Sequence, residues 1–343
     1  RVMPMSVQDL LDDTFESELL KAAVASGAIR DLRQGPRSGG TTFNLLHYMV
    51  GAMPGSHRAR SWFANGPDAF ADAAAATVRK FGGEVRTNAR IERITVKDGA
   101  VSGVALAGGE EIAAPIVIST ADPKRTLLGM VDPVWLDPEI GLAVSNVKLR
   151  GCSAFVFYGV DTLNDPDKTF VAPVSLTSTT TALERAADAA KYGEISAEPH
   201  IEFFAPTLRW PQLAPDGKHV IAARVQYAPY ALKEGAWTQT HAAALEKNVT
   251  AAIGRVIPKF AESVKHSLVL APKDVEDRFG VTEGAITQGE LMLDQILFMR
   301  PIPGWGRYAM PIRGLYLGGA GAHPGPGILG GAGFLAARAV LRG

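Results

Sequence analysis

Hydrophobic residues recur at helical spacing near the start of the chain and predict a helix over residues 5–29. Ser6 followed by Asp9 resembles a capping box in which Asp replaces the usual Glu. Residues 30–66 are rich in Gly and Pro around an apolar island at 43–50. His47 and Tyr48 in this island either line a substrate cavity or pack as ordinary buried aromatic residues, because both have an apolar body and a polar tip.

Residues 67–121 show the clearest alternation of elements. Pro67 is well placed in the first turn of a helix that ends near Phe81, where two glycines follow. Apolar alternation between turn residues then predicts extended segments at the positions that follow: 84–86, 90–96, 101–106 and 111–118. A helix, a β-meander and a returning strand are expected here.

The pattern becomes β-like after a proline-rich link at 132–138. Strands are predicted over four segments: 148–160, 170–177, 200–205 and 219–227. Because no helical crossover separates most of them, the sheet is expected to be antiparallel, with a short helix at 184–192 across it. One apolar face of this sheet either forms the wall of an apolar substrate cavity or is buried as in any sheet.

The last third returns to mixed elements. A helix is predicted over 236–257, a strand over 264–270, and a short helix from Pro272. Arg300 lies between an apolar run and Pro301. It either anchors a polar ligand group or is a structural arginine at a junction between domains.

The final thirty residues carry the pattern that is most informative about a ligand site. Leu315–Leu317 predicts a buried strand, glycines end it, and 334–341 predicts a helix with an apolar face. A strand that runs through glycines into a helix N-terminus brings bare backbone amides and a partial positive charge close to a ligand. We therefore expect a phosphate or another electron-rich group to bind there.

Two simpler interpretations of this terminus fail. The uncharged window 314–337 is long enough for a membrane span, but Pro324 and Pro326 cannot lie inside a spanning helix. Gly325–Gly330 matches G-x-G-x-x-G, yet a dinucleotide fingerprint needs a second strand and an acidic residue about 20 positions later. The sequence ends thirteen residues after Gly330, so the match is not a complete nucleotide-binding unit.

Composition narrows the chemistry further. The formal net charge is zero, which gives no field to attract nucleic acid, and the single cysteine, Cys152, excludes a disulfide framework and Cys-X-X-Cys chemistry. The sequence has no i,i+4 histidine pair, no Cys/His cluster and no G-x-S-x-G elbow, so it predicts neither a metal site nor a serine hydrolase. A signal peptide is not recognisable either, and we expect a cytoplasmic location.

The run from Leu291 to Leu341, centred on RPIPGWGRYAMPIRGLYLGGAGAHPGPGILGGAGFLAARAVL, resembles the C-terminal signature of the phytoene-dehydrogenase-like FAD-dependent oxidoreductases. Within them it is most similar to the branch named after a pyridine nucleotide-disulphide oxidoreductase domain. The resemblance implies a mixed α/β fold in which part of a Rossmann-type FAD domain is interleaved with a substrate domain of antiparallel sheet and helices. Because only one cysteine is present, "disulphide" in that name is no guide to mechanism.

The resemblance also implies roles for individual residues. The backbone of Ile91 is expected to contact the adenine of FAD. The residues expected to face the isoalloxazine ring and the pyrophosphate are Gly319, Ala320, Gly327, Ile328, Leu329 and Gly331. His323 either approaches the ring or stabilises its loop, and Tyr48, Arg300 and His323 are the candidate substrate residues.

The implied domain order alternates. Residues 1–60 correspond to helices of the substrate domain, 61–145 to the FAD domain, 146–305 to the substrate domain with its sheet, and 306–343 to the closing strand, loop and helix of the FAD domain. The family's N-terminal βαβ, with its own glycine-rich loop, is not among these residues. Since the sequence opens on Arg1 with mid-domain character, we expect a fragment that alone binds FAD weakly or not at all and is inactive.

The resemblance implies an FAD-dependent dehydrogenase or oxidase that desaturates a largely apolar small molecule by hydride transfer to the flavin. Three alternatives remain open: a non-catalytic flavin-fold relic that binds a partner, a flavin-dependent isomerase, and an amine oxidase. An amine oxidase needs an aromatic cage, for which Trp305 and Tyr308 are the nearest candidates. Peripheral membrane or partner-subunit contact is a further expectation.

Overall fold

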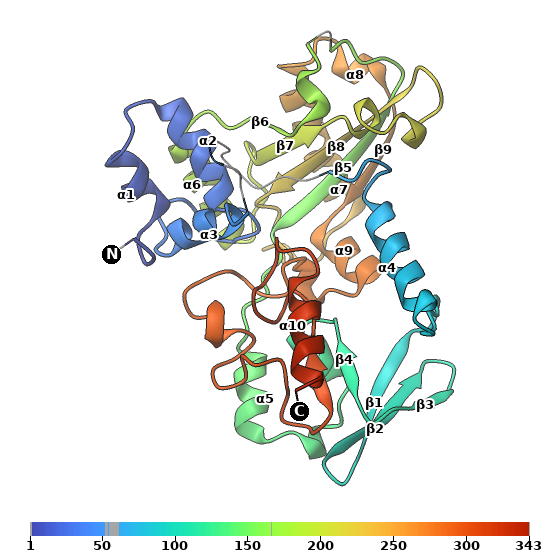
Figure 1. Ribbon diagram of the computed structural model, residues 1–343. Coiled ribbons are helices and arrows are strands. Elements are labelled where there is room, and N and C mark those ends of the chain that lie inside the picture. The colour runs from blue at the N-terminus through green and yellow to red at the C-terminus, as the bar shows by residue number, and fades with distance from the viewer. Residues whose placement is uncertain (1, 52–53, 55–61, 166, 343) are drawn as a thin grey trace.

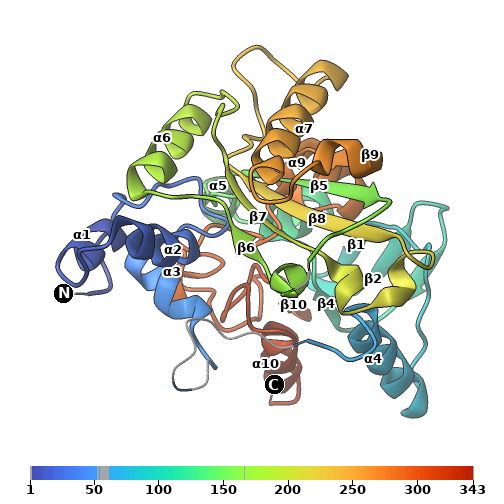
Figure 2. The same ribbon diagram turned by 90° about the horizontal axis from the view of Figure 1, so that it is seen from above.

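A computed structural model describes residues 2–51, 54, 62–165 and 167–342. Figure 1 shows an antiparallel sheet at the top, a group of N-terminal helices beside it, and a lower lobe that contains the chain's C-terminal helix. Figure 2 shows the same molecule from above, with α1–α3 and α4 on opposite sides. Segments far apart in the sequence therefore build each lobe.

The N-terminal helices form a small core of their own. They are α1 (Val7–Asp12), α2 (Glu18–Ala28), α3 (Thr41–Tyr48) and, from later in the chain, α6 (Thr180–Lys191). The predicted single helix over 5–29 is wrong, because the Ser17 hydroxyl accepts from the Leu20 N–H and starts a second helix. The Ser6 cap is confirmed, since its hydroxyl accepts from the Asp9 N–H. Helix α6 begins before the predicted 184 and packs on α2 rather than across the sheet.

The upper sheet has the strand order β6-β7-β8-β5-β9, and every pair is antiparallel, as predicted. Its strands are β5 (Ser153–Val160), β6 (Val174–Ser175), β7 (His200–Phe204), β8 (His219–Gln226) and β9 (Val264–Leu270). The predicted strand over 170–177 is reduced to β6, because Thr169–Val171 forms a 3-10 turn.

One face of the upper sheet is fully buried. Ala154, Val156 and Tyr158 point into a core shared with the face of α7 (Gln239–Gly254) that carries Leu245 and Val249. Helix α8 (Phe260–Ser263) closes this core, and α9 (Pro272–Phe279) follows β9. The alternation that predicted β5 is the pattern of a strand with one fully buried face.

The lower lobe begins with α4 (Asp68–Lys80) and a meander of β1 (Ile91–Lys97), β2 (Ala100–Leu106) and β3 (Glu111–Ala113). No strand forms at 84–86. The predicted strand over 111–118 is wrong, because the chain leaves the meander at Pro115 and β4 (Val117–Ser119) pairs in parallel with β10 (Leu315–Leu317). Proline has no N–H for a ladder, which explains the break. Helix α5 (Pro138–Ser145) packs below, and α10 (Gly331–Val340) covers β10.

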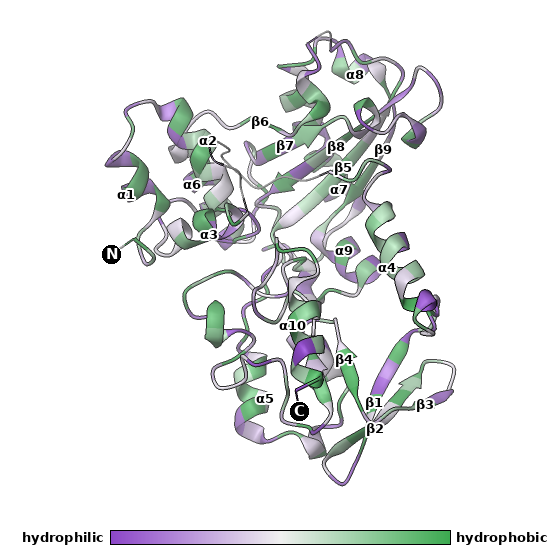
Figure 3. Ribbon diagram, in the orientation of Figure 1, coloured by the Kyte–Doolittle hydropathy of each residue, from purple (hydrophilic) through white to green (hydrophobic). Residues whose placement is uncertain are grey.

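Apolar side chains lie exposed on several elements of this lobe. None of the residues of α4 is buried, and Phe81 just after it is 81% exposed. Ile116 and Ile118 around β4 are exposed, and Phe334 on α10 is 63% exposed. Figure 3 shows the hydrophobic colour of β4 and of much of α10. A parallel strand pair is normally covered on both faces, so this surface is unusual for a finished sheet.

Candidate functional site

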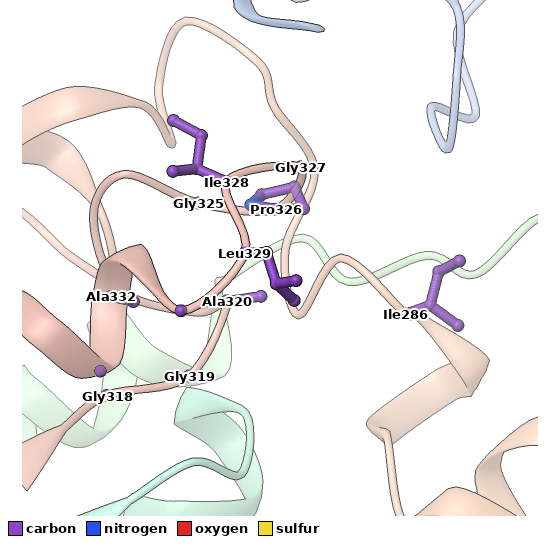
Figure 4. A pocket seen from close by; sticks show the side chains of 12 residues that line it. Ile286, Gly318, Gly319, Ala320, Gly325, Pro326, Gly327, Ile328, Leu329 and Ala332 are labelled. Carbon is purple, nitrogen blue, oxygen red and sulfur yellow. The ribbon is translucent and has the colours of Figure 1, made fainter. Parts of the chain in front are cut away.

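An open pocket of about 380 Å³ lies between the end of β10 and the start of α10 (Figure 4). Half of its lining residues are glycines, and the side chains of the other half are apolar. The lining residues are Ile286, Gly318, Gly319, Ala320, Gly325, Pro326, Gly327, Ile328, Leu329, Gly330, Ala332 and Gly333. The wall therefore offers peptide groups and carries no charged side chain.

The glycines after β10 allow two backbones to touch. A Cβ on Gly319 would lie 2.3 Å from the carbonyl oxygen of Thr120, and one on Gly318 would lie 2.9 Å from a methyl carbon of Ile118. The Gln288 side chain joins the same two loops, because it donates to the Thr120 carbonyl and accepts from the Gly321 N–H, each at 2.9 Å. Glycine is required here for close approach between chains.

Helix α10 directs its N-terminus at the pocket. Gly330 is its N-cap, has a φ of +71°, and gives no side-chain cap. The Gly331 N–H donates to the Ile328 carbonyl at 3.1 Å, so the N–H groups left for a ligand are those of Ala332 and Gly333, which line the pocket. The prediction that this helix starts at 334 is wrong, since it begins at Gly331 inside the glycine run. Uncapped N–H groups and the helix dipole favour an electron-rich ligand.

Helix α3 holds the other rim of the pocket. The His47 Nε2–H donates to the carbonyl of Pro326 at 2.6 Å, which fixes the tautomer because a carbonyl only accepts. Gly327 has a φ of +84°, and a Cβ there would lie 2.8 Å from the Tyr48 ring. The N-terminal helices therefore shape a loop near the other end of the chain.

Arg300 is buried next to the loop that follows β10, with 2% of its surface exposed. Its guanidinium donates to five backbone carbonyls, those of Thr287, Gly289, Glu290, Gln295 and Ala320. Burial lowers its pKa to about 10. These bonds leave no direction open for a substrate, so the structure favours the alternative of an arginine that ties loops together.

The other predicted site residues are distributed as follows. Five of the six candidates for the flavin, namely Gly319, Ala320, Gly327, Ile328 and Leu329, line the pocket, and Gly331 lies in the first turn of α10 directly behind it. Ile91 begins β1, opposite Leu106, and is not among the lining residues. Their roles toward FAD stay predictions.

The candidate substrate residues do not all lie at the pocket in the same way. Tyr48 contacts the pocket rim, whereas His323 is in the loop with its Nδ1 buried and lacking a partner in the described part of the chain. The proposed cage residues Trp305 and Tyr308 pack against the lower core instead of lining the pocket. Gln288 and Ile286 were missed, because they lie in an irregular segment without a periodic signal.

Acid should destabilise the fold through the two histidines at the pocket rim. Burial lowers the pKa of His47 and of His323 from the ordinary 6.5, and Arg300 nearby lowers both further. Because the folded state favours neutral imidazole, the unfolded chain binds more protons as the pH falls through 6.5, so stability drops there. The urea concentration at the midpoint of unfolding should decrease as the pH is lowered from 7.5 to 5. In His47→Gln, which keeps an N–H donor, this decrease should be smaller. The exposed His266→Gln is the control. An unchanged slope in His47→Gln would exclude His47 from the effect.

The described residues contain no group of His, Cys, Asp or Glu side chains arranged to hold a metal ion. Among the helices that the structure describes, none combines the length and apolarity needed to cross a membrane. No model of a protein family matches the sequence.

The chain is 34% identical over 355 residues to the pyridine nucleotide-disulfide oxidoreductase domain-containing protein 2 of Rattus norvegicus. That alignment covers 99% of this chain but 61% of the rat protein. It is also 27% identical over 269 residues to a neurosporene-forming phytoene desaturase of Rhodobacter capsulatus, covering 77% of this chain and 50% of that protein. The chain therefore spans less than two thirds of these relatives.

Solved structures share the fold at low identity. An oxidoreductase from Methanosarcina mazei superposes with a TM-score of 0.58 at 16% identity, covering 99% of this chain and 68% of that one. Putrescine oxidase bound to putrescine gives 0.56 at 13% identity, covering 99% and 68%. With these findings, the resemblance of the chain to the phytoene-dehydrogenase-like FAD-dependent oxidoreductases, and its mixed α/β fold of the amine-oxidase-like type, are confirmed.

Proposed function

We propose that this chain forms part of an FAD-dependent oxidoreductase that desaturates or oxidises a largely apolar small molecule. The observation that carries the proposal is the glycine-lined pocket between β10 and the N-terminus of α10. The relatives with oxidoreductase and desaturase names support the same chemistry. In this division, residues 61–145 and 306–343 serve the cofactor, and residues 1–60 and 146–305 serve the substrate.

The residues present fit a flavin in three respects. Glycine backbone allows a flat ring to approach closely, Ile286, Ile328 and Leu329 offer apolar contact to it, and the N–H groups of Ala332 and Gly333 at the start of α10 would face its electron-rich atoms. When bound, the flavin supplies the hydride acceptor. The chain's own residues position the ring, with Gly319 and Gly327 held in place by Thr120 and Tyr48.

The pocket is open, and apolar side chains of the same lobe lie exposed. We propose that a strand–glycine turn–helix unit outside these residues pairs beside β4, covers the exposed side chains around α4 and α10, and supplies the pyrophosphate contacts. Covering Phe81 and Phe334 would remove large apolar areas from water, which is favourable at about 25 cal/mol per Å². The cofactor site would then consist of two halves.

A flavin titration tests this proposal. The chain alone should bind FAD weakly or not at all by flavin fluorescence, whereas protein that also contains any strand–GxGxxG–helix encoded upstream of Arg1 should retain the cofactor. Micromolar or tighter binding by the chain alone would show that the second half is unnecessary. Extended protein that folds but never binds flavin would favour a non-catalytic, partner-binding relic instead.

A further inference from the structure

The upper sheet has a second face, opposite its buried core, that is only partly covered. Phe155 and Phe157 of β5 point to this face, where their cross-strand neighbours include Ala222 and Leu268. The Phe204 side chain of β7 points the same way, with the Trp62 ring 5.8 Å away. This aromatic face, defined by Phe155, Phe157, Phe204 and Leu268, is apolar and partly exposed.

A polar cluster adjoins one end of the aromatic face. Arg224 lies opposite Phe155 and Glu202 on the neighbouring strands, and its guanidinium bonds the carboxylate of Asp31. The Arg30 guanidinium lies 3.6 Å from Glu202 and 3.9 Å from Asp31. Two arginines and two acids are thus placed at the end of an otherwise apolar surface.

This cluster reaches the pocket through Tyr48. The guanidinium carbon of Arg30 lies 5.8 Å from the centre of the Tyr48 ring, and that ring contacts Gly327 in the pocket wall. The order in space is therefore the pocket, Tyr48, the polar cluster and then the aromatic face. A ligand that extends from the pocket over the sheet passes Arg30.

Hydrogen-bond donors are in surplus in the cluster. Both acid neighbours of Arg30 lie beyond 3.5 Å, and no closer acceptor exists for its guanidinium among the residues that the structure describes, while 36% of the side chain is exposed. The Nε of Arg224 is buried without a partner in the same part of the chain. Asp31, in contrast, already accepts from Arg224 and Ser153. An arginine guanidinium with unused N–H donors can bind a carboxylate, because the two carboxylate oxygens accept two parallel hydrogen bonds.

We propose that the substrate is an amphipathic carboxylate, whose acid group is bound by Arg30 and whose apolar body lies on the aromatic face. This inference rests on the proposed oxidoreductase function and makes it more specific. A pure hydrocarbon in the same position would take the polar cluster out of water without giving it an acceptor, which is unfavourable. The carbons next to the carboxyl group would then be the part of the apolar body closest to the pocket.

A fluorescent fatty acid tests the proposal without any flavin. The probe is 11-(dansylamino)undecanoic acid, and its methyl ester is the matched neutral ligand. We expect the acid to bind at least about tenfold more tightly than the ester, a difference typical of one charge-assisted pair. Arg30→Met should abolish this preference by weakening acid binding about tenfold, with the ester unchanged, and Arg30→Lys should restore part of it.

The exposed Arg255 lies beyond the buried core of the sheet, so Arg255→Met is the control and should bind both probes normally. Three outcomes would each overturn the proposal. The acid and the ester could bind equally well, neither could bind at 50 µM (a limit of about 6 kcal/mol), or folded Arg30→Met could lose affinity for both to the same extent. Should Arg30→Met fail to fold, Arg30→Gln and Arg30→Lys carry the same comparison. The probe measures carboxylate binding without FAD. If the protein failed to bind flavin but still preferred the acid over the ester, only the proposal that FAD is the cofactor would be rejected.

Discussion

Gly319→Ala is expected to lower the free energy of unfolding by about 3 kcal/mol and to prevent flavin binding by any form of the protein. The new Cβ would lie 2.3 Å from the Thr120 carbonyl oxygen and 2.6 Å from the Gln288 amide oxygen. The Gln288 amide is the end of a flexible side chain, whereas the Thr120 carbonyl belongs to the backbone just after β4 and cannot move without separating β4 from β10. Urea unfolding measures the loss directly.

Gly108→Ala is the matched control, because a Cβ at Gly108 meets no atom within 4 Å. This variant should unfold within about 0.5 kcal/mol of the parent chain, as surface changes usually do. If Gly319→Ala proved equally harmless, the close approach between the loops after β4 and β10 would not be the constraint that keeps glycine there.

Arg300→Met should destabilise the chain by about 4 kcal/mol, the largest effect that we expect from a single side chain. The guanidinium is buried and bonds five backbone carbonyls, including those of Thr287 and Ala320 on separate loops. Methionine fills part of the volume but leaves all five acceptors without this donor. Since Ala320 lines the pocket, the loss should also disorder the loop between β10 and α10 that contains Ala320.

Arg300→Lys separates charge from geometry. Lysine keeps the positive charge but has three donors on one nitrogen, so it cannot reach carbonyls on opposite sides of the fork. We expect it to recover less than half of the lost stability in the same urea experiment, and Arg255→Met, on the surface, to change it little. Full recovery by lysine would mean that charge alone, and not the fork of hydrogen bonds, stabilises these loops.

Local patterns predicted the parts of the fold that depend on local physics. The alternation in Ser153–Val160 identified β5, because one face of that strand is buried throughout. The glycines of the C-terminal run predicted a ligand close to the backbone between a strand and a helix N-terminus, and the family resemblance, not the local pattern, named the five residues that line the pocket. Pro115 was an available signal for the break between β3 and β4 that the strand pattern concealed.

The rest depends on contacts between distant segments. His47 and Pro326 are 279 positions apart, and neither residue type predicts the other. Gln288 bridges Thr120 and Gly321 from a segment with no periodic pattern. Arg300 was correctly singled out as unusual, but only its coordinates show that backbone carbonyls take all of its hydrogen bonds. Such positions are decided by tertiary packing, which a single sequence does not display.

Hydrogen–deuterium exchange on the flavin-loaded protein tests the central claim most directly, because backbone amides form most of the proposed site. The chain, together with any upstream unit that restores binding, would be compared with and without FAD. The account predicts slower exchange over residues 318–333, and no change over residues 243–262, which line the surface groove on the far side of the upper sheet's core. Bound flavin that leaves 318–333 unprotected would contradict it.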